Sequence, residues 1–324
     1  MHETRTRAGA EKMRIGYPCI NMTIGCKGDR TFRLKSYSVE RLKETVGNNL
    51  DCLLKILMFN EEHKILFFRI TSDLVPFASH PANTFNWQEH FRSEFEEIGE
   101  FIRKKGIRIS MHPDQFTLIN SVDKDIFSRS CKELAYHAQI LDLMKLDTRA
   151  KIQIHVGGVY KNKEKSMKRF VKRYFRLDSS IRCRLAVEND DRLYNVADCL
   201  KIGGETGLPM LFDVFHHGVN RTDTTVNGAL RLSSKTWNWK TDGIPMVDYS
   251  SQRIGGSPRQ HAESIDLRQF KNFLKETSPV DFDLMLEIKD KEKSAIKAVE
   301  VASNDSRFLK TIENWSGSER NDKS

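Results

Sequence analysis

The chain has 324 residues, of which 39% are hydrophobic, so it can fold around one large core or two modest ones. No stretch approaches the roughly 20 apolar residues of a membrane span, and residues 1–12 lack the apolar centre of a secretory signal. The formal net charge of +9 favours an anionic partner such as nucleic acid, although a basic, soluble surface explains it about equally well.

Short apolar runs alternate with helical patterns along the whole chain. Strands are predicted over residues 14–18, 65–70, 107–111, 151–156, 184–190, 209–214, 244–249 and 283–288. Helices are predicted over residues 41–58, 87–105, 123–146, 163–175, 193–206, 220–234, 264–276 and 291–301. Ser38 can cap the first helix with its hydroxyl, and Gly106 and Gly207 can end the second and the fifth.

Eight strand–helix units in one run predict an α/β fold, a single TIM (β/α)8 barrel over residues 13–301. The alternative is a doubly wound open sheet, but no G-x-G-x-x-G follows the first strand. Residues 1–12 are expected to be a disordered extension, with Met13 as an alternative start, and residues 302–324 an at least partly disordered tail. The six cysteines show no CxxC pair, which predicts reduced thiols rather than a disulfide framework or a zinc knuckle: Cys19, Cys26, Cys52, Cys131, Cys183 and Cys199.

Histidines and carboxylates stand at the ends of six consecutive predicted strands. In a barrel these ends meet at one face, where active sites lie. Imidazole and carboxylate ligands together suit Mn²⁺, Zn²⁺ or Fe²⁺, and two or three such ions would bind a phosphoryl group and activate water. One such residue alone is more often structural, but their joint occurrence favours a metal site: His112, His155, Glu188, Asp213, His216, Asp248 and Glu287. Glu188 lies between histidine ends and carboxylate ends, so we expect it to bridge two metals.

Eight segments in order carry a resemblance to the UV damage endonucleases, from residue 14 to about residue 289. They are RIGYPCIN (14–21), FRITSDLVPFASHP (68–81), ISMHPDQF (109–116), IHVGG (154–158), LAVEND (185–190), FDVFHH (212–217), HAESID (261–266) and LMLEIK (284–289). The resemblance implies a barrel related to apurinic endonucleases and xylose-isomerase-like enzymes. It also implies a divalent metal cluster, typically Mn²⁺, and incision of DNA immediately 5′ of cyclobutane pyrimidine dimers and (6-4) photoproducts.

The same resemblance assigns roles to single residues. His112, His155, Glu188, Asp213, His216, His261 and Glu287 are similar in position to the family's metal ligands. His80 matches an active-site histidine, Gln115 and Phe116 match a pair that wedges into the duplex, and Tyr17 matches an aromatic residue lining the damage site. Without the resemblance, we would expect the Gln115–Phe116 segment only to pack against the barrel mouth, and His80 only to be a loop histidine.

Two positions depart from the family pattern in the seventh strand. Many members have Lys, any residue, then His, whereas this chain has Met246 and Asp248. Asp248 can replace the histidine as a ligand for a hard metal ion, but Met246 supplies neither a cation nor an equivalent ligand. The number of metals, the preferred metal or the lesion range could therefore differ. Phe116 stands where many members have Tyr, which keeps the ring and loses the hydroxyl.

Two basic stretches lie outside these motifs. Residues 161–176 are interpreted as a solvated helix face whose first residues could reach phosphate. The loop with Trp237 and Trp239 is placed nearer the active face, where the tryptophans either cover the barrel rim or contact DNA.

The sequence thus predicts a metal-dependent endonuclease that nicks UV-damaged double-stranded DNA and leaves a 3′-hydroxyl and a 5′-phosphate. Its catalytic residues would be His80, Glu188 and Glu287, with two or three Mn²⁺ ions, or Zn²⁺ or Mg²⁺ as alternatives. A monomer without membrane partner or nucleotide cofactor is expected, in the cytoplasm near the nucleoid of a prokaryote or in a eukaryotic nucleus. The rivals are an apurinic endonuclease or sugar isomerase/epimerase, and a non-catalytic barrel that binds damaged DNA.

Overall fold

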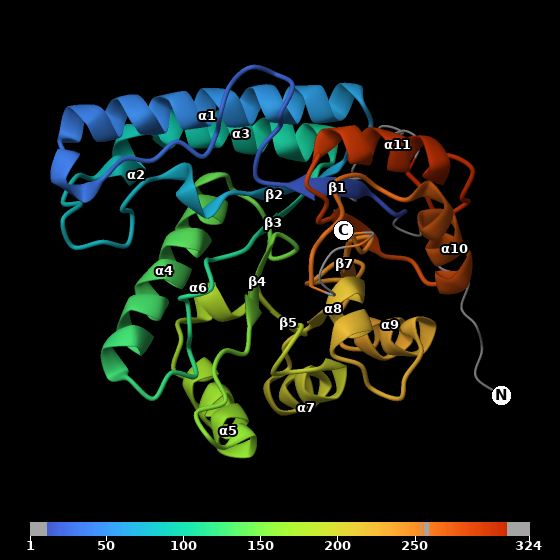
Figure 1. The fold of residues 1–324 in the computed structure, drawn as a ribbon. Helices are drawn as coiled ribbons and strands as arrows, with labels where there is room; N and C mark the ends of the chain where they lie inside the picture. Colours follow the sequence, from blue (N-terminus) through green and yellow to red (C-terminus); the bar gives the residue numbers. More distant parts are fainter. Residues whose placement is uncertain (1–11, 254, 256–258, 310–324) are drawn as a thin grey trace, which may run out of the picture.

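Eight parallel strands close into a barrel in chain order, with the last strand pairing with the first (Figure 1). The computed structural model describes residues 12–253, 255 and 259–309. The strands are β1 Ile15–Pro18, β2 Phe67–Ile70, β3 Arg108–Met111, β4 Lys151–His155, β5 Leu185–Glu188, β6 Met210–Asp213, β7 Met246–Tyr249 and β8 Asp283–Leu286. The predicted α/β TIM barrel is confirmed.

Helices surround this barrel, as the alternating pattern predicted. The longer ones are α1 Val39–Glu62, α3 Arg92–Lys105, α4 Lys124–Leu143, α5 Lys163–Tyr174, α7 Val196–Thr206, α9 Val226–Ser234, α10 Leu267–Thr277 and α11 Glu292–Ala302. The shorter ones are η1 Leu34–Ser36, η2 Ser72–Leu74, α2 Trp87–His90, α6 Ser179–Arg182 and α8 Val214–Val219. The Ser38 hydroxyl accepts from the Arg41 N–H at 3.1 Å, and Gly106 ends α3 in the left-handed conformation, as expected.

The predicted helix over residues 220–234 is confirmed for residues 226–234 but not for residues 220–225. Asp213, the last residue of β6, accepts a hydrogen bond from the His216 N–H at 2.6 Å and so caps α8 directly at the strand end. A second helix, α9, begins after Thr225, whose hydroxyl accepts from the Gly228 N–H at 3.1 Å. Val214 therefore belongs to α8 and not to the sixth strand.

Buried charges gather at the N-terminal ends of the strands. Asp283 of β8 pairs with Arg14 at 3.4 Å and Arg108 at 3.0 Å, and Lys151 of β4 pairs with Asp242 at 2.6 Å. These residues lie at the face opposite the strand ends that carry histidines and carboxylates. In TIM barrels this face is associated with stability rather than with catalysis.

The placement of the Trp237 loop near the active face is wrong. The Trp237 indole N–H donates to the carbonyl of Met210, the first residue of β6, at 2.7 Å, and only 9% of Trp237 is exposed. Its ring belongs to the cluster inside the barrel that also contains Phe67 and Met246. The loop connects a helix to the next strand, and such loops lie at the N-terminal face of a barrel. Trp239 is exposed in the same loop.

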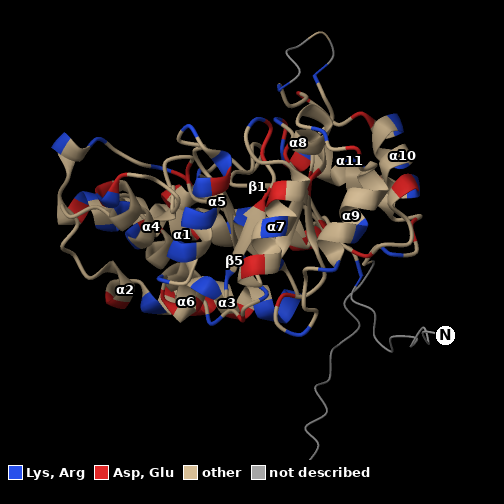
Figure 2. Cartoon of the chain, turned by 90° about the horizontal axis from the view of Figure 1, so that it is seen from below, with Lys and Arg blue, Asp and Glu red and all other residues tan. Residues whose placement is uncertain are grey.

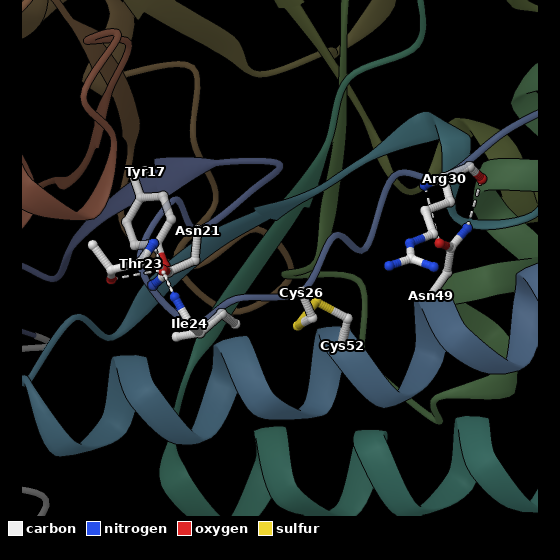
Figure 3. Close-up of a disulfide and its surroundings, with 8 residues drawn as sticks. All are labelled: Tyr17, Asn21, Thr23, Ile24, Cys26, Arg30, Asn49 and Cys52. Atoms are coloured by element: carbon white, nitrogen blue, oxygen red, sulfur yellow. Dashed lines mark hydrogen bonds between the residues drawn. A yellow bond between two sulfur atoms is a disulfide. The ribbon is translucent and has the colours of Figure 1, made fainter.

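The prediction of reduced thiols fails for two of the six cysteines. Cys26, in the loop after β1, forms a disulfide with Cys52 of α1 (Figure 3). Their Cα atoms lie 5.8 Å apart although 26 positions separate them in sequence, a proximity that only the tertiary fold creates. The other four cysteines are free.

The chain continues past α11 along the barrel. Met13 and Phe308 form a bridge, and Arg307 donates hydrogen bonds to the carbonyls of Leu274 and Val280. Residues up to 309 therefore pack against the domain, whereas the disorder expected for residues 1–12 and the remaining tail falls almost entirely outside the described residues. No helix in the described part of the chain is long and apolar enough to cross a membrane. Basic and acidic residues are interspersed over the helices (Figure 2).

Candidate metal centre

Three overlapping groups of side chains gather at the C-terminal ends of the strands. Within each group one ligand atom per residue lies within 4.8 Å of the others. Glu188 belongs to the first and second groups, and Asp213 to the second and third. The groups are His112, His155 and Glu188; then Glu188, Asp213 and His216; then Asp213, Asp248 and Glu287.

The strand register explains why these residues meet. His155 of β4 pairs with Glu188 of β5, and Asp213 of β6 pairs with Asp248 of β7. His112 and Glu287 immediately follow β3 and β8. The apolar runs end at the same level around the barrel, so the first polar residue after each run faces a common centre.

The two oxygens of Glu188 face different histidines. Oε2 lies 3.2 Å from His112 Nε2, and Oε1 lies 3.5 Å from His216 Nδ1. The amide of Gln153 also donates to Oε2 at 2.8 Å and fixes the carboxylate. Burial favours the neutral acid, but His155, His112 and His216 outweigh it and hold the pKa of Glu188 well below its usual range. This is the arrangement expected of a carboxylate shared by two cations.

The side chain of His155 has a ring nitrogen that could bind a cation. Its Nδ1 is buried and has no hydrogen-bond partner among the described residues. Burial, supported by nearby His112 and His216 and opposed by Glu188, lowers the pKa of His155, which favours the neutral imidazole. A neutral imidazole with a free nitrogen is the ligand form of histidine.

The third group already contains a cation from the protein. Nη2 of Arg69 in β2 lies 2.8 and 2.7 Å from the two oxygens of Asp248, and Nη1 donates to Glu287. The Gln153 amide also donates to Asp248 at 2.8 Å. Burial raises the pKa of Asp248, with Glu287 and Glu188 adding to the effect and Arg69 opposing it. For Glu287, burial is outweighed by Arg69, which lowers the pKa.

Arg69 and Gln153 were missed from the sequence. Both lie inside short strands that are buried along almost their whole length, FFRI and KIQIH. The available signal was their position, because each polar side chain follows an apolar residue in the second half or at the centre of a buried strand. A buried charge or amide there requires a partner inside the barrel mouth.

Two predicted site histidines lie outside the three groups. His261 Nδ1 is 2.7 Å from the backbone oxygen of Glu287, and its ring centre is 6.5 Å from that of His216, so it borders the cluster. His80 is exposed in the loop after η2, where its Nδ1 accepts from the Ala82 N–H at 3.1 Å. Within the described residues, no contact joins His80 to the cluster.

Gln115 and Phe116 lie at the rim of the cluster. Gln115, His112, His155 and His216 line one pocket of about 340 Å³. Phe116 is 72% exposed, and its N–H is held by the Asp114 carboxylate at 2.7 Å. A large aromatic ring that projects into solvent beside a cluster of candidate metal ligands can contact a macromolecule.

Tyr17 does not line the open surface of the mouth. It is completely buried, and its hydroxyl donates to Asn60 of α1 at 2.7 Å. The same hydroxyl accepts from Asn21 at 2.9 Å (Figure 3). The side chain therefore points from β1 toward the helix layer. It holds the start of the loop after β1 instead of presenting a ring to a ligand.

Comparison with known proteins identifies the family. The family model described as UV-endonuclease UvdE matches residues 13–318. The chain belongs to the UvdE family. A UV DNA damage endonuclease from Clostridium perfringens is 36% identical over 94% of this chain and 75% of its own length. A crystal structure of SacUVDE has a TM-score of 0.86 and 44% identity, and the match covers 90% of this chain and 98% of that one.

More distant structures share the barrel alone. Endonuclease IV from Thermus thermophilus matches with a TM-score of 0.54 and 15% identity over 77% of this chain and 92% of its own. This likeness shows the fold and no more. Membership of the UvdE family supports the general function, an endonuclease of UV-damage repair.

Proposed function

We propose that this protein is a metal-dependent endonuclease that nicks double-stranded DNA immediately 5′ of UV photoproducts. Cyclobutane pyrimidine dimers and (6-4) photoproducts are the proposed lesions, and the products are a 3′-hydroxyl and a 5′-phosphate. The observation that carries the proposal is the chain of overlapping ligand groups, joined by Glu188 and Asp213, beside an exposed Gln115–Phe116 pair.

The donor set fits divalent metal ions. It combines imidazoles with carboxylates and contains no thiolate, which suits Mn²⁺ and also Zn²⁺. Burial and the neighbouring carboxylates raise the pKa of Asp213 well above its ordinary range although His216 opposes them. Part of this effect comes from the excess of negative charge in the mouth, which bound cations would relieve. Bound ions supply Lewis-acid stabilisation of the phosphate and a nucleophile near neutral pH.

We propose two ions in this chain rather than three. His112, His155 and Glu188 would hold one, and Glu188, Asp213 and His216 the other. In the third group, the guanidinium of Arg69 takes the position of a cation. Four ionised carboxylates and one guanidinium leave three negative charges, and two divalent ions change this to one positive charge. The single negative charge of a bound phosphodiester would balance this one positive charge of the site.

Neighbouring groups hold the proposed metal ligands in fixed orientations. The Gln153 amide orients Glu188 and Asp248 together, since it donates to both. The His112 Nδ1 lies 2.6 Å from the Pro113 carbonyl, which leaves Nε2 toward Glu188. Such support of metal ligands by neighbouring groups maintains affinity and geometry.

Recognition of the lesion is assigned to Gln115 and Phe116. Moving a damaged dinucleotide out of the stack leaves a gap and unpaired bases. The Phe116 ring can fill the gap, and the Gln115 amide can donate to and accept from a base edge. A sugar isomerase, which encloses a small substrate, has no use for an aromatic ring exposed at the rim.

Incision of defined duplexes tests the proposal. End-labelled duplexes carry one thymine dimer, one (6-4) photoproduct, one abasic site or no lesion, and each is incubated with Mn²⁺ or EDTA. We expect a single nick 5′ of each photoproduct with Mn²⁺ and none with EDTA. Cleavage of the abasic duplex alone would support the apurinic endonuclease instead, and binding without cleavage under any divalent metal would support the non-catalytic barrel.

A further inference from the structure

The segment that carries Gln115 and Phe116 is held at many points. We define residues 114–122 as the wedge loop. The Asp114 carboxylate accepts from the Phe116 N–H at 2.7 Å, and the Leu118 N–H donates to the Ser130 hydroxyl of α4 at 2.8 Å. The Asn120 side chain donates to the Gly158 carbonyl at 2.9 Å. A loop fixed in this way keeps its tip in one orientation.

Two arginines of α5 complete the support. Arg173 donates to the carbonyls of Ile119, at 3.0 Å, and Ser121. Arg169 donates to the carbonyl of Asn120 at 2.6 Å. Three successive carbonyl groups of the wedge loop are thus bound by guanidinium groups from one helix, which sequence analysis had interpreted as a solvated basic face.

The environment of Arg173 is unusual for a buried cation. The residue is 8% exposed, and no ion pair with a carboxylate forms among the described residues. Its guanidinium lies 4.3 Å from the centre of the Phe127 ring. Burial, together with Arg169 and Arg176, lowers its pKa. Burying a guanidinium without an acid is costly, so the carbonyl contacts must provide something that an apolar residue could not.

Gly157 shows that the contact between this loop and the barrel is close. Gly157 follows β4 with a φ of 105°, and a Cβ at that position would overlap the Asn120 side-chain oxygen. A larger residue there would be strained by the positive φ and would have to displace the Asn120 and Leu118 side chains of the wedge loop. The IHVGG segment therefore has two roles. His155 is a candidate metal ligand, and Gly157 allows the wedge loop to pack closely against the end of β4.

We infer that Arg173, assisted by Arg169, is a positioning residue that sets the orientation of Gln115 and Phe116 toward the DNA. The inference rests on the proposed function. Helix α5 and the wedge loop form one rigid unit, and the inward arginines act on damage recognition through the loop rather than by contacting phosphate. The exposed lysines of α5, Lys165, Lys168 and Lys172, have no part in this support.

A double-mutant cycle tests the inference. Arg173→Met should lower kcat/KM for a thymine-dimer duplex by about 100-fold, the scale of a misplacement of about 1 Å in a reacting complex. Arg176→Met is the matched control, since Arg176 is exposed and contacts the same Phe127 ring at 5.7 Å; it should change kcat/KM less than about 3-fold. In a background of Gln115→Ala with Phe116→Ala, Arg173→Met should have almost no further effect. A full, additive loss in that background would overturn the inference.

Two further measurements separate positioning from the other roles of an arginine. A residue that contacts phosphate changes the slope of log affinity against log salt by about 0.9, so the slope for undamaged duplex should be the same in Arg173→Met and wild type. A changed slope would contradict the inference. Arg169→Met, at a half-buried position, removes one hydrogen bond to the wedge loop and one to Ser166 within α5. It should give a smaller loss with the same dependence on the wedge pair, and it serves if Arg173→Met does not fold. If wild type fails to nick the dimer duplex, the proposed function fails; if wild type and Arg173→Met nick it equally well, only this inference fails.

Discussion

Replacing Arg69 with methionine tests the assignment of two metals. The Arg69 side chain is 4% exposed and bridges Asp248, which is 0% exposed, and Glu287, which is 21% exposed. Met has similar length and no charge, so Arg69→Met leaves both carboxylates without their cation. Removing one partner of a buried ion pair costs about 3–5 kcal/mol. We expect the free energy of unfolding in EDTA to fall by this amount.

Mn²⁺ should restore part of the lost unfolding free energy by binding where the Arg69 guanidinium lies in wild type. In Arg69→Met the third group offers Asp213, Asp248 and Glu287 without a competing guanidinium. A ligand at 100 times its dissociation constant stabilises the folded state by about 2.7 kcal/mol. Urea unfolding with Mn²⁺ should therefore show a larger gain for the variant than for wild type. A Mn²⁺ titration followed by electron paramagnetic resonance should saturate at two ions in wild type and three in the variant.

Arg108→Met is the matched control. Arg108 pairs with Asp283, also 0% exposed, at 3.0 Å, but at the opposite end of the barrel. The control should also lose stability, although less, because Arg14 still lies 3.4 Å from Asp283. Mn²⁺ should not restore this loss more than it stabilises wild type. The reasoning is refuted if wild type binds three ions, or if Arg69→Met costs less than about 1 kcal/mol in EDTA, the level of an exposed pair.

Three other outcomes follow from single residues. Glu188→Gln should reduce incision by more than about 100-fold, the upper range for merely loosening the support of a metal ligand, and should lower the Mn²⁺ stoichiometry; a variant with normal incision would remove Glu188 from the site. Burial lowers the pKa of His137 to about 4. As pH falls from about 6.5, His137 is therefore protonated in the unfolded chain before it is protonated in the folded one. About 3 kcal/mol of unfolding free energy that is present above pH 6.5 should be lost by pH 4. Urea unfolding of wild type against His137→Gln measures this as a difference in pH slope, and equal slopes would contradict it. Reduction of the Cys26–Cys52 disulfide, which spans 26 positions, should cost about 3 kcal/mol of unfolding free energy, whereas a Cys26→Ser, Cys52→Ser variant should not respond to reductant.

The sequence predicted the barrel because each strand is a short apolar run and each run is followed by a helical pattern. The polar residues that directly follow those runs, such as Glu188 and Asp213, could also be predicted to meet, since strand ends are level in a closed barrel. Asp213 shows the limit of this reasoning. It ends a strand and caps α8 at the same time, so a helix began where a loop was expected.

The side-chain partners inside the barrel could not be predicted. The periodicity of a sequence shows which face of a strand points inward, but not which residue of another strand it meets there. Arg69 was hidden in an apolar strand although it meets Asp248 from a distant part of the chain. The same holds for Cys26 and Cys52, which the fold brings together from a loop and a helix. For the Trp237 loop, chain order was the better signal. The loop runs from a helix to the next strand, and such loops lie at the N-terminal face of a barrel.

The buried arginines also change what the net charge of +9 means for DNA binding. The two arginines next to the wedge loop, Arg169 and Arg173, face its carbonyl groups instead of solvent. Attraction to phosphate must therefore come from other basic residues that are exposed, such as Lys168 and Arg192, which act on any duplex, whereas discrimination must come from the wedge loop, which acts only where a lesion weakens the stack. On α5 the exposed lysines serve the first contribution, and the inward arginines serve the second through the wedge loop that they support. Raising the salt concentration should hence weaken binding of damaged and undamaged duplexes alike, and loosening the wedge loop should weaken only the former.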